Sequence, residues 1–238
     1  MEQAQRLELP LQLVTALSGK DLTENELKCY DAKAHNRRYS FEMMPNQKAC
    51  VLSHRKALKT FLDSAADYAV VLEDDALLAD NFKEGIHELT CRLQGWECAK
   101  LYTDSGKLIP LLPQVAEDAP VQPIFPKKLL WVAVGYLYTR AAAEKLYASL
   151  GHFWRGADAQ IGMTLLKEGI PTIGVTPSLV RTSDPDNLTS TIDTDHTRTQ
   201  RKGGRSLLQF ICYRLHVWNV AIGKWRMRRM MQRRLSRR

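Results

Sequence analysis

Hydrophobic and polar residues alternate along the chain in blocks that predict strands and helices in turn. Short apolar runs predict buried strands at residues 9–17, 69–72, 98–103, 129–139 and 170–175. Apolar residues at helical spacing predict helices at residues 46–65, 81–95, 140–150 and 157–169. Because strands and helices alternate, we expect an α/β domain with a mostly parallel central sheet.

Two of the predicted helices carry clear signatures. The helix at 46–65 gathers its apolar residues on one face, made of Val51, Leu58, Phe61, Leu62 and Ala65. The helix at 81–95 begins with Asn81 and Glu84 in the spacing of a capping box, and Gly95 is expected to end it. Its apolar stripe consists of Phe82, Ile86, Leu89 and Leu93. Both stripes predict helices with one buried face.

Charge is divided unevenly along the chain. The net charge is +8, but from Thr197 onward there are 13 Lys and Arg and no Asp or Glu. The rest of the chain has 21 basic and 26 acidic residues, a net charge of −5. We therefore divide the chain into a domain at residues 1–200 and a basic tail at residues 201–238. Such asymmetry indicates a tail that meets an anionic surface, either a membrane or nucleic acid.

The tail is expected to form an amphipathic helix. Its apolar side chains fall on one helical face and are Leu207, Ile211, Leu215, Trp218, Ile222 and Trp225. Gln209 and Arg214 interrupt the apolar run, so the helix is not a transmembrane span. A Trp-rich basic helix suits an anionic membrane surface, whereas an apolar stripe can also dock on the domain. We expect a mixture, with the residues before Gly223 docked and those beyond it at the membrane.

The cysteines and the N-terminus indicate a reducing, cytosolic environment. The five cysteines are scattered and form no Cys-x-x-Cys pair, which argues against a zinc ribbon or a disulfide framework. The first ten residues lack the basic and apolar regions of a signal peptide.

Three consecutive acids, Glu73, Asp74 and Asp75, directly follow the apolar run at 69–72. In α/β sheets, ligands bind outside the carboxyl ends of strands. Adjacent carboxylates repel each other unless a cation neutralises them, and Mg²⁺ or Mn²⁺ takes such oxygen ligands together with substrate phosphates. The cluster therefore indicates a site for a divalent cation and a phosphate-bearing ligand or, with about equal weight, a solvated acidic turn.

Three segments, taken in order, carry a family resemblance. Residues 48–82 read KACVLSHRKALKTFLDSAADYAVVLEDDALLADNF, a Leu-Ser-His helix followed by a strand that ends in Glu-Asp-Asp. Residues 131–146 add a Gly-Tyr strand with an Ala-rich helix, and residues 156–180 add an Asp before the last predicted strand. In this order and spacing, residues 10–200 resemble glycosyltransferase family 25, the bacterial lipopolysaccharide and lipooligosaccharide glycosyltransferases.

The resemblance implies a GT-A-like nucleotide-binding fold and an inverting transfer of a hexose. The implied donor is a UDP-sugar, typically UDP-galactose, with Mn²⁺ or Mg²⁺ as the cofactor. The implied acceptor is lipooligosaccharide or lipopolysaccharide core. We then expect a cytoplasmic protein that lies peripherally on the inner face of the cytoplasmic membrane and binds no nucleic acid.

The same resemblance assigns roles to the acids. It implies that Asp75 binds the metal ion, that Asp74 supports the loop or supplies a second metal oxygen, and that Glu73 lies near the ribose. Ser53 and His54 match the family's Ser-His pair and are expected to contact the nucleotide or to orient the acidic loop. A lone His on a helix is, however, more often a packing residue.

An inverting transfer also needs a base for the acceptor hydroxyl. Asp158 is the candidate, because it opens a predicted helix in the segment that resembles the family's Asp-bearing one. Its competing role is plain N-capping. Tyr136 is a candidate for lining the acceptor site or, alternatively, a core aromatic.

Three other functions compete with the transferase. A nucleic-acid binder would use the arginines of the tail, but it leaves the acids without a role, and no helix-turn-helix, zinc-finger or RNA-binding signature is present. A metal-dependent phosphohydrolase would need more ligands near a strand end. The third is a truncated, inactive relative of the family.

The N-terminus departs from the family's pattern. Members open with a strand and an Arg-bearing helix before the segment that resembles residues 9–17. Here Met1 lies within what resembles the end of that helix, so we expect an incomplete nucleotide-binding sheet. We favour a start upstream of Met1, with about 15–25 further residues. The alternative is a truncated relative that is inactive or needs another segment to complete the sheet.

Overall fold

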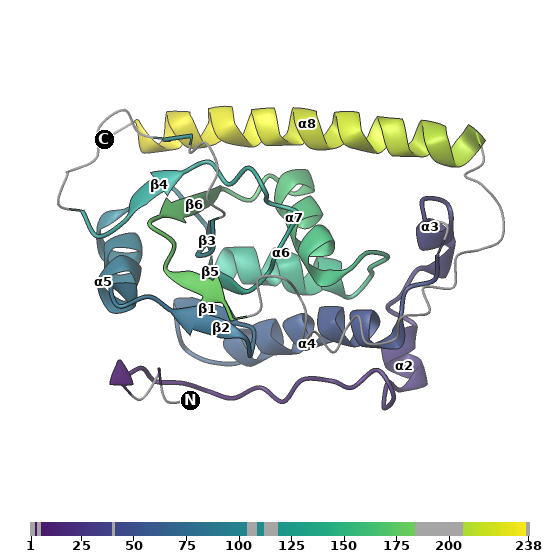
Figure 1. Ribbon diagram of the computed structural model, residues 1–238, viewed down its shortest axis with the longest axis horizontal. Coiled ribbons are helices and arrows are strands. Elements are labelled where there is room, and N and C mark those ends of the chain that lie inside the picture. The colour runs from purple at the N-terminus through teal and green to yellow at the C-terminus, as the bar shows by residue number, and fades with distance from the viewer. Residues whose placement is uncertain are drawn as a thin grey trace.

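The fold is built around a five-stranded sheet, seen here in a computed structural model (Figure 1). The structure describes residues 3, 6–39, 41–103, 109–111, 119–183 and 207–236, and for residues 207–213 it describes the backbone alone. The strands of the sheet are β1 (Tyr68–Leu72), β3 (Cys98–Lys100), β4 (Gln122–Ile124), β5 (Gly135–Thr139) and β6 (Thr172–Thr176). They lie in the order β1-β5-β3-β6-β4, and the predicted α/β class is confirmed.

The sheet is mixed, so the expectation of a mostly parallel sheet is not confirmed. β3 and β6 pair in parallel, whereas β1 with β5, β5 with β3, and β4 with β6 pair antiparallel. The reason is that β5, reached after the long loop, enters between β1 and β3 in the reverse direction. β1, β3 and β6 therefore still run the same way, and their carboxyl ends lie at one edge of the sheet.

Helices cover the sheet, and most of the helices predicted from the sequence are present. The longest inside the domain is α4 (Pro45–Leu62), which packs against α6 (Arg140–Leu150) and α7 (Ala157–Lys167). Two short helices, α2 (Glu24–Leu27) and α3 (Ala32–Asn36), precede them. Val51, Leu58 and Phe61 of the predicted α4 stripe are buried, whereas Ala65 lies beyond the end of the helix.

The predicted helix at 81–95 consists of two parts. It begins as α5 (Phe82–His87) and continues as a π-helix, η1 (Glu88–Arg92). The capping box predicted at its start is wrong, because the Asn81 side chain makes no cap hydrogen bond and instead donates from Nδ2 to the Pro120 carbonyl. Gly95 follows the helix with a φ of +87°, a conformation that favours glycine.

The strand predicted at residues 9–17 is wrong. This segment runs extended without strand pairing, and Leu11 and Leu13 are 46% and 72% exposed. It is held to α4 instead, by hydrogen bonds from the Leu17 amide to Ser53 Oγ and from Lys56 Nζ to the Thr15 carbonyl. β1 consequently lies at the edge of the described sheet, and its apolar run, predicted to be buried, is only half-buried.

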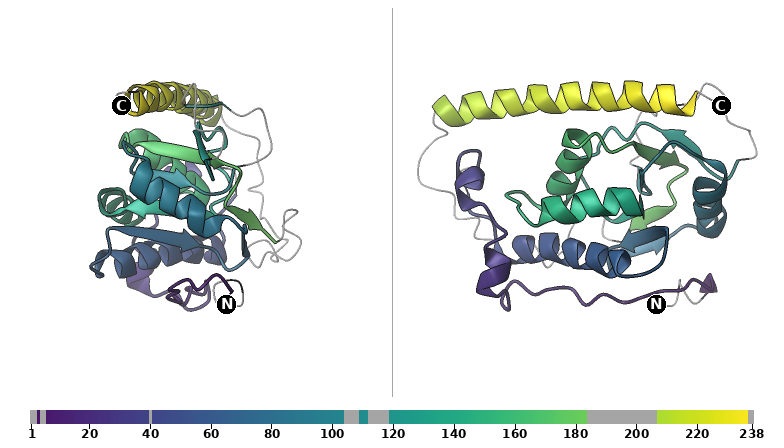
Figure 2. Two further views of the ribbon diagram at one scale, coloured as in Figure 1. Left: turned by 90° about the vertical axis from the view of Figure 1, so that its left-hand side faces the viewer. Right: turned by 180° about the vertical axis from the view of Figure 1, so that it is seen from behind.

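The tail forms a single helix, α8 (Leu207–Leu235), which runs along the side of the molecule opposite the N-terminal segment (Figures 1 and 2). Its C-terminal half is docked, since Met227, Met231 and Leu235 are at most 3% exposed. Its earlier half carries the exposed apolar residues, among them Leu215 and Trp218. The docked residues expected before Gly223 are thus found beyond it, because apolar residues four apart give the arginine-rich half its own buried face.

The length and hydropathy of the helices decide whether one of them could span a membrane. Within the described ranges, none of them combines the length and the hydropathy that crossing a bilayer requires.

The docking of α8 can be tested by core truncation. Met231 is fully buried, so we expect Met231→Ala to lower the free energy of unfolding by about 2–4 kcal/mol. Leu215→Ala is the matched control: Leu215 is 59% exposed on the same helix, and its loss should cost less than about 0.5 kcal/mol. Urea unfolding of both variants measures the difference. Equal, small effects would mean that α8 is detached in solution.

Candidate functional site

The three acids lie where the sequence predicts them, directly after a strand. Glu73, Asp74 and Asp75 form the turn between β1 and β2 (Ala76–Leu78). β2 pairs antiparallel with β7 (Val180–Thr182) in a separate two-stranded sheet, in which Ala76 faces Thr182. This turn is called the acid loop below.

Asp75 is the most constrained acid of the loop. Thr182 Oγ1 donates to its Oδ2 at 2.5 Å, and the Ser183 amide donates to its carbonyl at 2.9 Å. Burial raises the pKa of Asp75, the Thr182 hydrogen bond opposes this, and the charges of Glu73 and Asp74 add to the rise. Its other oxygen, Oδ1, is buried and has no hydrogen-bond partner among the described residues. A buried, unpartnered carboxylate oxygen beside other acids fits a bound cation.

The other two acids point to different surroundings. Asp74 is exposed to solvent. Glu73 Oε1 lies 3.1 Å from Nε2 of His54, a residue of α4 whose side chain is buried. Burial alone lowers the pKa of His54, but hydrogen bonds to Cys50 and Glu73 raise that pKa to about 10. Because the Glu73 carboxylate accepts, the His54 ring donates to it and ties the acid loop to α4.

Ser53, the neighbour of His54, has a different part. Its hydroxyl donates to the Ala49 carbonyl at 2.8 Å and accepts from the Leu17 amide at 2.8 Å. Both partners are backbone groups, so Ser53 fastens the extended segment at 9–17 to α4.

Asp158 lies in the first turn of α7, but it does not cap this helix. The N-cap is Gly156, without a side-chain hydrogen bond, and Asp158 Oδ2 instead accepts from the Val132 amide at 3.0 Å. Val132 has a φ of +54°, which is strained for a β-branched residue. Asp158 thus holds a strained loop, which also carries Trp131, 64% exposed. Strain of this kind occurs mostly at functional sites.

A buried lysine, which the sequence analysis missed, lies within electrostatic reach of Asp158 and of Glu73 in the acid loop. Lys100, at the end of β3, is 2% exposed, and its Nζ donates to the carbonyls of Lys128 and Trp131. Burial lowers its pKa to about 8, and the charges of Asp158 and, more weakly, Glu73 oppose this shift. A lysine inside an apolar strand was the signal that could have identified it.

Tyr136 lies in the same sheet, opposite Lys100 in the β3–β5 pairing. It is 1% exposed and stacks on Tyr138, as expected of a core aromatic. Its hydroxyl is buried without a partner in the part of the chain that the structure describes. Burial raises its pKa well above the usual value, and the charges of Asp158 and Glu73 contribute. Lys100 and Tyr136 are therefore both within electrostatic reach of Glu73 in the acid loop and of Asp158.

The family model described as glycosyltransferase family 25 (LPS biosynthesis protein) matches residues 1–160, about two thirds of the chain. The matched part includes the acid loop, His54 and Asp158. No curated protein gives a significant match.

The low pKa of Lys100 predicts a pH dependence of stability. The unfolded chain keeps this proton up to a pKa of about 10.5, whereas the folded protein releases it near 8. The folded state therefore gains stability as the pH rises through this window. We expect the free energy of unfolding to rise by roughly 2–3 kcal/mol between pH 7 and pH 10, relative to Lys100→Met. A difference between the two proteins that does not change with pH would show that Lys100 stays charged in the fold.

Proposed function

Because this chain belongs to glycosyltransferase family 25, a family of lipopolysaccharide biosynthesis, we propose that it is an inverting hexosyltransferase. The proposed donor is a UDP-sugar, UDP-galactose in the first instance, and the acceptor is lipooligosaccharide or lipopolysaccharide core. The observation that carries the proposal is the acid loop at the end of β1, in which Oδ1 of Asp75 is buried and has no partner within the described residues. Strands β1, β3 and β6 end at the same edge, which supports a GT-A-like nucleotide site there.

Asp75, with the exposed Asp74, would hold Mn²⁺ or Mg²⁺. The bound ion supplies positive charge beside the diphosphate as it leaves. Glu73 would accept hydrogen bonds from the ribose, and His54 holds its carboxylate in place from α4. Thr182 would fix the orientation of Asp75, so that its Oδ1 stays directed at the cation.

Asp158 is the proposed base. Its Oδ2 is held by the Val132 amide, and its carboxylate would accept the proton of the acceptor hydroxyl. The acceptor oxygen then attacks the anomeric carbon, the bond from that carbon to the diphosphate breaks, and UDP leaves. Lys100 lies within electrostatic reach of Asp158, so it places a positive charge near the proposed base.

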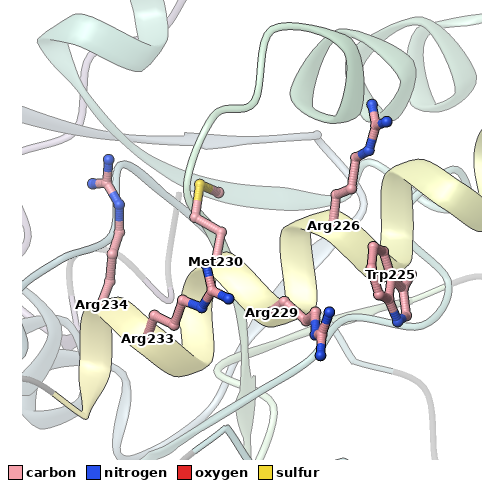
Figure 3. Close-up of a pocket in the computed structure, with 6 residues that line it drawn as sticks. All are labelled: Trp225, Arg226, Arg229, Met230, Arg233 and Arg234. Carbon is pink, nitrogen blue, oxygen red and sulfur yellow. The ribbon is translucent and has the colours of Figure 1, made fainter.

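The exposed face of α8 is the proposed membrane contact. Its apolar residues Leu215, Trp218, Ile222 and Trp225 are between 42% and 64% exposed. Toward the C-terminus the helix lines a pocket of about 400 Å³ with Trp225, Arg226, Arg229, Met230, Arg233 and Arg234 (Figure 3). Exposed tryptophans beside arginines suit the headgroup region of an anionic inner membrane, where a lipid-linked acceptor would be found.

The same face argues against nucleic acid as the partner. Exposed Leu215 and Ile222 contribute nothing to phosphate binding but suit a lipid surface, and a nucleic-acid partner would leave the acid loop without a role. We therefore expect no stable complex with DNA or RNA.

Asp75→Asn tests the proposed reaction. The variant keeps the shape of the side chain but removes its charge, so we expect kcat/KM for sugar transfer to fall about 100-fold or more. Calorimetry should show a matching loss of UDP binding in the presence of Mn²⁺. Asp80→Asn is the control, because Asp80 lies nearby with its side chain 96% exposed. Wild-type transfer by Asp75→Asn would rule out Asp75 as the metal ligand.

The donor itself can be identified by thermal shift. UDP-galactose, UDP-glucose and UDP-N-acetylglucosamine are compared with Mn²⁺ present, and the true donor at 100 times its Kd should add about 2.7 kcal/mol of stability. A wild-type chain that binds none of them would support the alternative of an inactive relative.

The membrane contact predicts a charge-dependent affinity for vesicles. Each basic residue near an anionic surface contributes about 1 kcal/mol, so the triple variant Arg226→Gln, Arg229→Gln and Arg233→Gln should bind about 100-fold more weakly. Co-sedimentation with phosphatidylglycerol vesicles at low salt measures this. Trp131→Ala is the control, because Trp131 is as exposed as Trp218 but lies on a loop and not on α8. Unchanged binding of the triple variant would rule out this face.

A further inference from the structure

We propose that Cys50, His54 and Glu73 form a binding site for a thiophilic divalent cation, of which Zn²⁺ is the best fit. This site is separate from the oxygen site assigned to Asp75, and it does not depend on the proposed transferase activity. Its three donor atoms are a thiol sulfur, an imidazole nitrogen and a carboxylate oxygen, and all lie within 4.8 Å of one another.

The fold brings these donors together from two elements. Cys50 and His54 are four residues apart in α4, so their side chains lie on the same face of the helix. Glu73 reaches them from the end of β1, and its amide donates to the Val134 carbonyl, which fixes the backbone there. The site is therefore built on a helix and a strand end, both of which hold their side chains more rigidly than a free loop does.

The spacing of the donors fits a tetrahedral ion. Zinc–ligand bonds of about 2.0–2.3 Å place neighbouring donors about 3.3–3.8 Å apart. His54 Nε2 and Glu73 Oε1 are already 3.1 Å apart, and small side-chain rotations bring Cys50 Sγ into range. The side chain of His54 is 8% exposed and that of Glu73 is 32% exposed, so the fourth coordination position opens on the side of Glu73.

The chemistry of the donors separates this site from its neighbour. Sulfur and imidazole ligands select Zn²⁺ and similar ions, whereas carboxylates alone suit Mg²⁺ and Mn²⁺. In this arrangement, Zn²⁺ replaces the protons that the three side chains share, and those protons pass to the solvent. Two cation sites of different preference thus lie side by side, because Glu73 and Asp75 are two residues apart.

The shared position of Glu73 gives the site a regulatory consequence. A Zn²⁺ ion bound here coordinates the Glu73 carboxylate, which is then no longer available to accept hydrogen bonds from the ribose. If the proposed function holds, Zn²⁺ therefore inhibits donor binding, and an excess of Mn²⁺ at Asp75 does not reverse the inhibition. This consequence rests on the proposed function, whereas the site itself is tested without it.

Cobalt spectroscopy of the full chain tests the site directly. Titration with Co²⁺ should produce a near-ultraviolet thiolate-to-cobalt band and the intense visible bands of a four-coordinate ion, both complete at one equivalent. Zn²⁺ should abolish the bands, and an excess of Mn²⁺ should not. Cys50→Ser should remove the thiolate band, whereas the control Cys91→Ser, a change at an exposed cysteine, should keep it.

Two further variants make the test independent of folding defects and of the transferase. Glu73→Gln should weaken Zn²⁺ binding, measured by competition with a chromophoric chelator, at least about 10-fold. Asp75→Asn should keep the cobalt bands, even where it abolishes sugar transfer. No thiolate band in the wild type, or an unchanged band in Cys50→Ser, would overturn the proposal and leave the cluster as a hydrogen-bonded relay that holds Glu73.

Discussion

Three consecutive carboxylates can share the end of one strand only if the fold holds each of them differently. Glu73 is turned toward α4, where His54 donates to it. Asp75 is turned toward β7, where the hydroxyl of Thr182 donates to it, and Asp74 faces the solvent. Because neighbouring like charges would otherwise repel, this separation ties the acid loop to two elements that are distant in the sequence. The positions of α4 and β7 are therefore part of the site.

The mixed strand directions of the sheet determine where Lys100 and Tyr136 lie. The reversed strand β5 lies between β1 and β3, so its beginning meets the carboxyl ends of both neighbours. There Tyr136 lies opposite Lys100, and the charges of Asp158 and Glu73 both act on Tyr136. A fully parallel sheet would have put the far end of β5 at this edge. The reversed direction of β5, which departs from the expected topology, thus brings Tyr136 beside Lys100 at the edge where β1 and β3 end.

Periodicity predicted the elements whose packing is local and missed those that depend on distant partners. α6 and α7 were found because each has its own apolar stripe, and the acid loop because polar residues abruptly follow an apolar run. The apolar run at residues 9–17 predicts a strand. A strand also needs a neighbouring strand to pair with, however, and the pattern within one segment does not show whether such a neighbour exists. Lys100 was missed for the same reason, since its partners are carbonyls about 30 residues away.

The docking of α8 has a consequence for how the chain folds. Gly223 packs on Leu166 and Arg234 approaches Gly95, so the core closes only when residues 57 and 139 positions apart have met. Contacts of such long range slow folding and leave apolar surface exposed to aggregation in the meantime. A chain shortened to end before Met227, in order to remove the arginines beyond it, would lose the closing contacts as well. Its poor behaviour would then reflect an unfinished core rather than the loss of a membrane anchor.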